Sequence, residues 1–477
     1  MKTRLPGFLI SLICILCVAF FYGYPHIGQL LPQGSHLWRQ ADCLAMAQNY
    51  RQFHLPFLQP ETYNLQSDNG KVAGEFPLFY FIAACFSNTA LALRVLHTFL
   101  FLCGIMATYF IAFHFLRRQL LSVFCTLLLF TSPLLVFYGN NFLSDVPALS
   151  VSFIGWAIFF GAYRKRKPGW LAVSFLFFTL GALLKASQVI NFCILFIMLA
   201  SSNIPQQRVK LILSGCFLIP VVLWYVYAKS YNRLHHDNYY CLNIAPIWEL
   251  SFYDIGLGIW RMVVSLSNNY FWRPVSLVLL GSVYFLLKHR KKLERDLRLI
   301  MLSSFLLTIL YILLFYQKMS GHEYYYTVFF IFMLFALIGI LKTYNRFHSE
   351  NIFAHSVLFM LLIPAIIFCK FFTAEKLSDN LYNGYLSSAE MQDFLLTHGV
   401  TETRTILSLP DDSPNKTLCL LKRKGFTEFN DYTLILKAKK SDFLLLGNDS
   451  WKNDRTISPS LQDSIGSFHG FTLYRLK

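Results

Sequence analysis

Residues 35–52, SHLWRQADCLAMAQNYRQ, bring together two side chains that can do chemistry directly after an apolar N-terminal run. Arg39 and Asp42 are three residues apart, so they share one face of a helix that begins near Leu37. At a membrane surface Asp42 could take the proton of an attacking hydroxyl group. Arg39 would orient the carboxylate and lower its pKa. The simpler alternative is a surface ion pair. The spacing makes Asp42 the first candidate for a general base.

Three further stretches place a charge at the border of an apolar segment. GEFPLFY (74–80) puts Glu75 before a Phe-Pro step. NNFLSDVPAL (140–149) puts Asp145 at the start of an apolar run, where it could equally cap a helix. GALLKAS (181–187) carries a lone Lys185 at the end of a run, and its alternative role is to snorkel to the interface.

GHEYYYT (321–327) gathers His322, Glu323 and Tyr325 at another border. Tyrosines there commonly form an aromatic belt. The stretch is not an HExxH zinc motif, because Tyr326 and Thr327 stand where a second histidine ligand would be needed. The 11 cysteines lie mostly inside apolar blocks and show no metal or disulfide spacing. We predict no metal site, but the sequence leaves a divalent metal open.

These polar groups come from several different connections, and together they suggest one cavity on a single side of the membrane. Cationic groups could hold a phosphate there by charge-assisted hydrogen bonds, and the candidates are Arg39, Lys185, Arg273 and His322. One carboxylate would then serve proton transfer. Such a cavity suits a substrate with an anionic headgroup and a lipid tail.

The elements that must position these residues are membrane-spanning helices. The chain has 477 residues, 55% hydrophobic and only 14% charged, and its apolar residues come in long blocks that can cross a bilayer. We predict an all-α polytopic membrane domain over residues 1–371. Its eleven spans are 7–24, 90–116, 119–137, 146–163, 168–184, 188–202, 209–228, 274–287, 299–316, 325–341 and 352–371. The first is interpreted as a retained span, because no cleavage site follows it.

The charges of the connections predict the orientation. Six connections are basic and are expected in the cytoplasm: Lys2 with Arg4, Arg117 with Arg118, 164–167, 206–210, 288–292 and 342–346. The others, including the first outer loop at 25–89, carry acids and aromatics. The N-terminus is then cytoplasmic and the C-terminus lies outside. The net charge of +17 fits basic loops beside anionic membrane lipids. No basic reading surface points to a nucleic-acid partner.

Composition changes near residue 372, and 13 of the 25 acidic residues follow it. Apolar runs at 405–409 and 442–447 predict strands, and residues 388–398 and 430–439 predict helices. Residues 372–477 are therefore expected to form a small α/β domain on the outer side. No motif in this tail suggests chemistry. It holds two glycosylation sequons, NKT (415–417) and NDS (448–450).

The stretches LWRQAD, GEFPLFYF, SDVPAL, LLKAS and HEYYY, in this order, make residues 1–371 resemble the polyprenyl-phosphate-dependent glycosyltransferases of the GT-C fold. That class includes the protein O-mannosyltransferases and the lipid A aminoarabinose transferases. The resemblance implies that Asp42, in the first outer loop, is the catalytic acid. It also implies a lipid-linked sugar donor, inverting transfer and a bacterial inner-membrane location. The acceptor, whether lipid, glycan or protein, stays open. Cys43 stands where the protein mannosyltransferases typically have a second acid.

Substrate contacts are assigned to Arg39, Glu75, Asp145, Lys185, Arg273, His322, Glu323 and Tyr325. Single displacement with one carboxylate suffices for inversion, whereas a retaining mechanism needs a second carboxylate about 5 Å away. Two other functions remain. A flippase for lipid-linked sugars would also have many spans, although it tends to show internal repeats that this sequence lacks. An O-antigen polymerase or ligase would have an outer loop rich in Arg and His, as residues 229–273 are.

Overall fold

The computed structural model describes residues 5–165, 168–201, 207–240, 243–348, 352–379, 381, 384–430, 434–448 and 461–476. The basic pair Lys2 and Arg4, parts of two further basic connections (166–167 and 206) and part of the second sequon (449–450) lie outside these ranges. The chain forms two compact units. The membrane unit comprises Met1–Gly28, His97–Trp224 and Asn243–Lys376. The second unit comprises Gln29–Leu96, Tyr225–Leu242 and Leu377–Lys477, and we name it the outer unit after the orientation predicted from the sequence.

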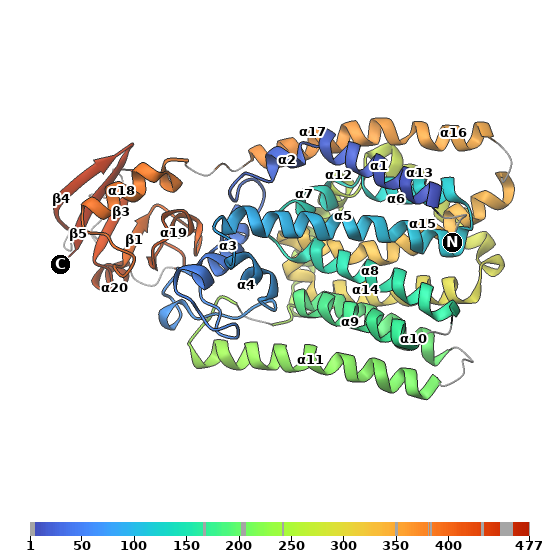
Figure 1. Cartoon of the computed structure of the whole chain (residues 1–477), viewed down its shortest axis with the longest axis horizontal. Coiled ribbons are helices and arrows are strands. Elements are labelled where there is room, and N and C mark those ends of the chain that lie inside the picture. The colour runs from blue at the N-terminus through green and yellow to red at the C-terminus, as the bar shows by residue number, and fades with distance from the viewer. Residues whose placement is uncertain are drawn as a thin grey trace. The chain divides into compact units, whose positions relative to one another are not determined.

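The membrane unit is built from helices that run alongside one another (Figure 1). Three of the helices, α5, α11 and α17, contribute residues to both units. The helices are α1 (Leu5–Phe21), α2 (Tyr24–Ile27), α5 (Thr89–Leu116), α6 (Gln119–Leu129), α7 (Pro133–Gly139), α8 (Asp145–Lys165), α9 (Pro168–Leu184), α10 (Ile190–Ala200), α11 (Gln207–Leu234), α12 (Phe252–Asn269), α13 (Arg273–His289), α14 (Arg295–Gly321), α15 (Phe329–His348), α16 (Ile352–Met360) and α17 (Leu362–Ser378).

The apolar helices make the protein a multi-pass membrane protein. Within the described ranges, six helices are long and apolar enough to cross a bilayer, or up to eight if each bent pair counts as one span. The bent pairs are α6 with α7, at 71°, and α12 with α13, at 109°. Each of the eleven predicted spans coincides with one or two of the helices, whereas α12 lies in a stretch that we expected to be an outer connection. The number eleven stays a prediction.

Small and polar residues let the membrane helices approach closely. Gly181 on α9 faces Ser152 on α8, and a Cβ atom there would meet the serine Oγ at 2.6 Å. Trp156 on α8 is fully buried, and its indole N–H donates to Asn191 on α10 at 2.8 Å. Such packing is typical of membrane helices, whose association gains little from the hydrophobic effect.

The outer unit contains two helices from the first outer loop, α3 (Leu37–Gln52) and α4 (Leu78–Ala84), which pack on each other. Helix α3 begins where predicted. It is not strongly apolar, yet eleven of its 16 residues are buried, including Gln40, Asp42 and Asn49. A helix that buries polar side chains must provide each with partners, so α3 is the natural place to look for a site.

The C-terminal part of the outer unit is a small α/β sheet with the strand order β2-β1-β3-β5-β4. Its central strands β1 and β3 are parallel and fully buried, as their uninterrupted apolar runs predict. Strands β4 and β5 form an antiparallel hairpin, whose two turn residues, His469 and Gly470, have the positive φ that such turns favour. The elements are α18 (Ala389–Thr397), β1 (Ile406–Leu409), α19 (Lys416–Leu421), β2 (Gly425–Phe426), α20 (Leu434–Lys439), β3 (Phe443–Leu446), β4 (Leu461–Phe468) and β5 (Phe471–Leu476).

The four expected elements of the tail agree with these bounds. The runs at 405–409 and 442–447 are β1 and β3, and residues 388–398 contain α18. The last expected helix, 430–439, contains α20, although residues 431–433 lie outside the described ranges. The predicted fold class, an all-α membrane domain with a small α/β domain, is confirmed.

Candidate active site

Arg39 does not serve Asp42 alone. Its Nη2 donates to both carboxylate oxygens of Glu75, each at 2.8 Å, whereas its Nη1 lies 3.6 Å from Oδ2 of Asp42. The guanidinium also lies over the Tyr240 ring, 5.3 Å from its centroid. One buried cation is thus shared by two carboxylates, and its short, charge-assisted hydrogen bonds go to Glu75.

Asp42 itself is fully buried, and each of its carboxylate oxygens accepts one hydrogen bond. The hydroxyl of Tyr239 donates to Oδ2 at 2.9 Å, and the side-chain amide of Asn415 donates to Oδ1 at 2.8 Å. The Tyr240 hydroxyl also favours the charged form, although it makes no hydrogen bond of standard geometry. Each oxygen has two lone pairs; Oδ2 also faces the Arg39 guanidinium at 3.6 Å, so Oδ1 keeps one lone pair for a further partner.

The tyrosine pair is held by polar side chains of its own segment. The carboxylate of Asp237 accepts the backbone N–H groups of Tyr239 and Tyr240, at 3.2 and 2.8 Å. Asn232 on α11 donates to the carbonyl groups of Ala73 and Tyr240 and accepts the Ala73 N–H. It therefore ties the strand-like segment before Glu75 to the tyrosines. The Asn232 amide donates to the carbonyl and accepts from the N–H of the same residue, Ala73, as a paired backbone would in a sheet.

Burial dominates the electrostatics of Asp42. Removal from water raises its pKa from 3.8 to about 6, although the charge of Arg39 and the bonds from Asn415, Tyr239 and Tyr240 each oppose this. Our expectation of a lowered pKa was wrong, because it counted Arg39 and not the full burial of the carboxylate. A carboxylate with a pKa near 6 is ionised at neutral pH and is still basic enough to accept a proton in a transition state.

The neighbouring groups keep their ordinary charges. Burial lowers the pKa of Arg39, but Glu75 and the other acidic groups around it outweigh burial, and the pKa is raised. Burial raises the pKa of the Cys43 thiol to about 12, so this residue stays protonated. The Tyr80 hydroxyl donates to its sulfur at 3.3 Å. Cys43 therefore adds no second acid to the site.

The membrane unit holds a second set of predicted residues. Lys185, which follows α9, forms an ion pair with Asp145 at the start of α8, at 3.1 Å. Its ammonium group also lies over the Tyr324 and Tyr325 rings, 5.4 and 5.6 Å from their centroids. Both partners of the ion pair are largely buried, with 13% and 3% of their side chains exposed. Lys185 therefore does more than snorkel, and Asp145 does more than cap a helix.

Glu323 belongs to a third group. Its Oε1 accepts a hydrogen bond from Tyr138 at 2.8 Å and pairs with Lys376 near the end of α17. Lys376 is 6% exposed and also donates to Asn269 at 2.7 Å. Glu323 of the His-Glu stretch thus forms a buried ion pair with Lys376, which anchors the 3₁₀ helix Glu323–Val328.

The remaining two predicted residues are His322 and Arg273. The His322 ring stacks on Tyr324 with 5.5 Å between centroids. Arg273, at the start of α13, is exposed, and its guanidinium is held by Asn268 at 2.9 Å. The structure thus brings together Arg39, Asp42 and Glu75 in one unit, and Asp145, Lys185, His322 and Tyr325 around Tyr324 in the other. The single shared cavity stays a prediction.

The side chains around Asp42 offer few ligands for a metal ion. Among the described residues, no three His, Cys, Asp or Glu side chains converge as ligands. Both oxygens of Glu75 are engaged by Arg39, which removes the nearest second carboxylate as a ready ligand for a cation beside Asp42. The proposed chemistry below uses none.

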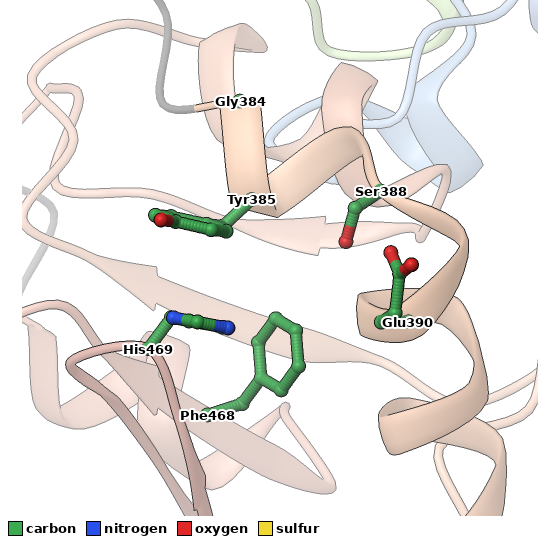
Figure 2. Close-up of a pocket in the computed structure, with 6 residues that line it drawn as sticks. All are labelled: Gly384, Tyr385, Ser388, Glu390, Phe468 and His469. Atoms are coloured by element: carbon green, nitrogen blue, oxygen red, sulfur yellow. The ribbon is translucent and has the colours of Figure 1, made fainter.

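Two hollows of the outer unit are lined by other residues. One, of about 1120 Å³, lies beside the C-terminal half of α3 and includes Gln48, Arg51 and Lys422. The other, of about 460 Å³, is lined by Tyr385, Glu390 and His469 (Figure 2). There the rings of Tyr385 and His469 stack face to face, 4.0 Å apart. None of the nine predicted site residues lines either hollow.

Sequence reasoning missed Tyr239, Asn415 and Lys376. The pair Tyr239-Tyr240 follows two histidines and an aspartate, a polar cluster that could have drawn attention. Asn415 was noted only as a glycosylation sequon, yet it is fully buried and bonded to Asp42, so it is not accessible as an acceptor. Lys376 gives no local signal, because its partners Glu323 and Asn269 come from distant helices.

No family model and no curated protein matches the sequence. Solved structures match over nearly the whole chain. ArnT from Cupriavidus metallidurans, in its apo state and bound to undecaprenyl phosphate, is 10% and 12% identical, with a TM-score of 0.61 and 97% of each chain covered. The Archaeoglobus fulgidus oligosaccharyltransferase is 11% identical, with a TM-score of 0.54, 92% of this chain and 68% of that chain covered. The fold is that of the GT-C glycosyltransferases.

Proposed function

We propose that this GT-C-fold membrane protein is a glycosyltransferase that moves a sugar from a polyprenyl-phosphate donor to a hydroxyl acceptor, with inversion, on the outer face of the membrane. The observation that carries the proposal is the state of Asp42: a fully buried carboxylate with a pKa raised to about 6, which shares one arginine with Glu75. The likeness to ArnT, which was solved with bound undecaprenyl phosphate, supports the donor class.

Asp42 acts as the general base in this proposal. The acceptor hydroxyl attacks C1 of the sugar and gives its proton to a free lone pair of the carboxylate, while the bond from C1 to the phosphate oxygen breaks on the opposite face. Arg39, at 3.6 Å, and the donors Tyr239 and Asn415 hold the carboxylate in place. The leaving group is the polyprenyl phosphate, a stable anion. The reaction therefore needs cations beside the phosphate rather than a strong general acid.

Lys185 is the best candidate to hold the donor phosphate. Its ammonium group is oriented by Asp145 and lies against Tyr324 and Tyr325. An aromatic wall beside a cation suits a phosphate attached to an apolar chain, because the rings pack on the lipid while the charge meets the anion. His322 and Arg273 remain cationic candidates from the sequence for the same phosphate, and the exposed Arg273, held by Asn268, is expected to contribute less than Lys185.

The function is tested by incubating purified protein with undecaprenyl phosphate linked to labelled glucose, mannose, galactose or arabinose. Crude lipid, glycan and protein fractions of the cell envelope serve as acceptors. We expect transfer of label and release of undecaprenyl phosphate without any nucleotide sugar, abolished by Asp42→Asn. A chelator arm tests for a metal. A protein that only moves the intact donor across vesicles, with no release, is a flippase.

Orientation is tested separately. The basic connections predict that the N-terminus is cytoplasmic and that the outer unit faces the periplasm of a bacterial inner membrane. A reporter fused after Lys477 should be active only outside the cytoplasm. Activity of the reporter in the cytoplasm would contradict the orientation, and with it the assignment of residues 25–89 to an outer loop.

A further inference from the structure

Asn415 comes from the C-terminal tail, 373 residues after Asp42 in the chain, and is nevertheless its direct partner. The side-chain Nδ2 donates to Oδ1 of Asp42 at 2.8 Å, and both residues are fully buried. The tail thus supplies one of the two hydrogen bonds that the carboxylate oxygens accept. No motif around Asn415 predicts this contact.

The amide of Asn415 has only one orientation that satisfies its neighbours. Its Oδ1 accepts the backbone N–H of Asn64 at 3.0 Å. Because a backbone N–H can only donate, the atom that faces it must be the oxygen, and the NH₂ group must therefore face Asp42. The side chain of Asn64 donates to the Pro414 carbonyl at 2.7 Å, which holds the two segments in register.

The turn that carries Asn415 is itself braced. The buried carboxylate of Asp411 accepts the hydroxyl groups of Ser413 and Thr417, each at 2.6 Å, and their backbone N–H groups. Beyond the turn, Gly425 on β2 exchanges backbone hydrogen bonds with Tyr63 and Leu65 of the first outer loop, at 2.9 Å each. The position of the Asn415 amide beside Asp42 is therefore fixed by hydrogen bonds within its turn and between β2 and the first outer loop.

We propose that Asn415 is a positioning residue for the general base: the C-terminal tail fixes the carboxylate of Asp42 through the Asn415 amide, which leaves a lone pair of Oδ1 for the reaction. This inference rests on the proposed function, since it concerns the same carboxylate. It gives the tail a direct part in catalysis, although the tail holds no catalytic residue.

The groups that face Asp42 allow the effect of Asn415 to be predicted. They are Arg39 with Glu75 behind it, Tyr239 and Tyr240, and the thiols of Cys43 and Cys419. Asn415 is a neutral donor that favours the ionised carboxylate. Its removal therefore raises the pKa of Asp42 further above its ordinary value, by about one unit for a bond of this kind.

The first experiment measures the protonation of Asp42 as a function of pH, without any substrate. Infrared difference spectra of the full-length protein are recorded across pH, and the carboxyl C=O band that disappears in Asp42→Asn is followed. Its midpoint should move upward by about one pH unit in Asn415→Ala. Ser441→Ala is the matched control: it removes a buried side-chain hydrogen bond, from Ser441 to the Lys437 carbonyl, elsewhere in the tail and no contact with Asp42, and its midpoint should match the wild type.

The second experiment reads the reaction, with the panel of labelled undecaprenyl-phosphate sugars. Asn415→Ala should lower kcat by roughly fivefold at pH 6 and move the acid limb of the pH–rate profile upward, with a smaller change in KM. In the Asp42→Asn background, Asn415→Ala should add no further loss, because a positioning residue acts only through the group that it positions.

Each outcome decides. An unchanged infrared midpoint in Asn415→Ala, or a shift of equal size in Ser441→Ala, overturns the positioning role while leaving Asp42 as the base. A fully active Asp42→Asn overturns the proposed function and this inference with it. If Asn415→Ala does not fold, Asn415→Asp keeps the shape, places an oxygen opposite Oδ1, and should shift the midpoint further upward; no shift there has the same negative meaning.

Discussion

Among the contacts of the described residues, Asp42 and Glu75 share the single guanidinium of Arg39, whereas Asp145 and Glu323 have one lysine each. All four carboxylates are largely buried, and all lie in stretches that the sequence marked as candidates. The formal charge is −1 around Arg39 and zero in each lysine pair. A carboxylate with its own ammonium group has little reason to take another proton, whereas the carboxylate left over beside Arg39 does.

Under the proposed function, we infer separate roles for the two regions. The site around Asp42 suits a proton transfer, because its excess negative charge is held in place by neutral donors, Tyr239 and Asn415. The pairs of the membrane unit are arranged for fixed geometry. Aromatic rings surround Lys185, and Lys376 joins α17 to the 3₁₀ helix that carries Tyr324 and Tyr325. One region would move a proton and the other would hold a lipid phosphate.

The largest expected effect compares the transfer rates of variants at Asp42 and Asp145, the proposed base and the proposed structural partner of Lys185. Asp42→Asn should lower transfer by roughly 10²–10⁴-fold, the usual cost of losing a general base. Asp145→Asn should stay within about tenfold of the wild type, since it weakens one charge-assisted bond. Initial rates of labelled-sugar transfer measure both. The opposite ranking would make Asp145 the base.

The next largest effect concerns stability. Lys376→Met leaves Glu323 buried without its cation, and breaking one side of a buried pair costs about 3–5 kcal/mol. The double variant Lys376→Met with Glu323→Gln should recover most of this loss. Lys416→Met serves as a control, because this lysine is 34% exposed and lies 3.7–3.8 Å from Asp411 and Asp412, where pairs contribute about 0–1 kcal/mol. Thermal unfolding in detergent measures all three, and an unchanged melting temperature in Lys376→Met would remove the structural role.

The affinity for undecaprenyl phosphate tests the role of Lys185, the lysine beside Asp145. Lys185→Ala should weaken binding of undecaprenyl phosphate by roughly 1.5–3 kcal/mol, the worth of a charge-assisted hydrogen bond. Arg273→Ala should change it by less than about 1 kcal/mol, because this guanidinium is exposed and is held by Asn268. Titration of detergent-solubilised protein by native mass spectrometry gives both values. Equal losses would mean that the phosphate lies nearer to Arg273.

The sequence predicted those features that depend on local pattern. Apolar blocks located the membrane helices, uninterrupted apolar runs located β1 and β3, and the spacing of Arg39 and Asp42 placed both on α3. Contacts set by packing could not be predicted in the same way. Asn415 reaches Asp42 across 373 residues of chain. The shorter contact of Arg39 with Glu75 than with Asp42 follows from how two separate segments of the loop fold.

Burial was the other missing quantity. The sequence shows that Arg39 is near Asp42, and the sign of that interaction was predicted correctly. It does not show that α3 is enclosed on nearly all sides, and this enclosure reverses the net shift in the pKa of Asp42. Helix α12 was missed for a related reason, because its polar neighbours made residues 229–273 read as one outer connection.

The smallest expected effect distinguishes the two regions through a matched pair of tyrosines. Tyr239 donates to Asp42 at 2.9 Å, and Tyr138 donates to Glu323 at 2.8 Å. Tyr239→Phe removes a bond that favours the ionised base, so the pKa of Asp42 rises above about 6. The base must be ionised to act, and the rate therefore falls as pH drops through that pKa.

At pH 6 the Tyr239→Phe enzyme should thus lose roughly threefold in rate, and at pH 8, where the carboxylate is ionised in both proteins, it should lie within about twofold of the wild type. Tyr138→Phe takes the same hydroxyl from a carboxylate that already has its own lysine and has no part in proton transfer. Its pH–rate profile should keep the wild-type acid limb, even if the protein melts at a lower temperature. Parallel shifts in the two variants would mean that both carboxylates titrate in the reaction, and the division between a proton-transfer region and a structural one would fail.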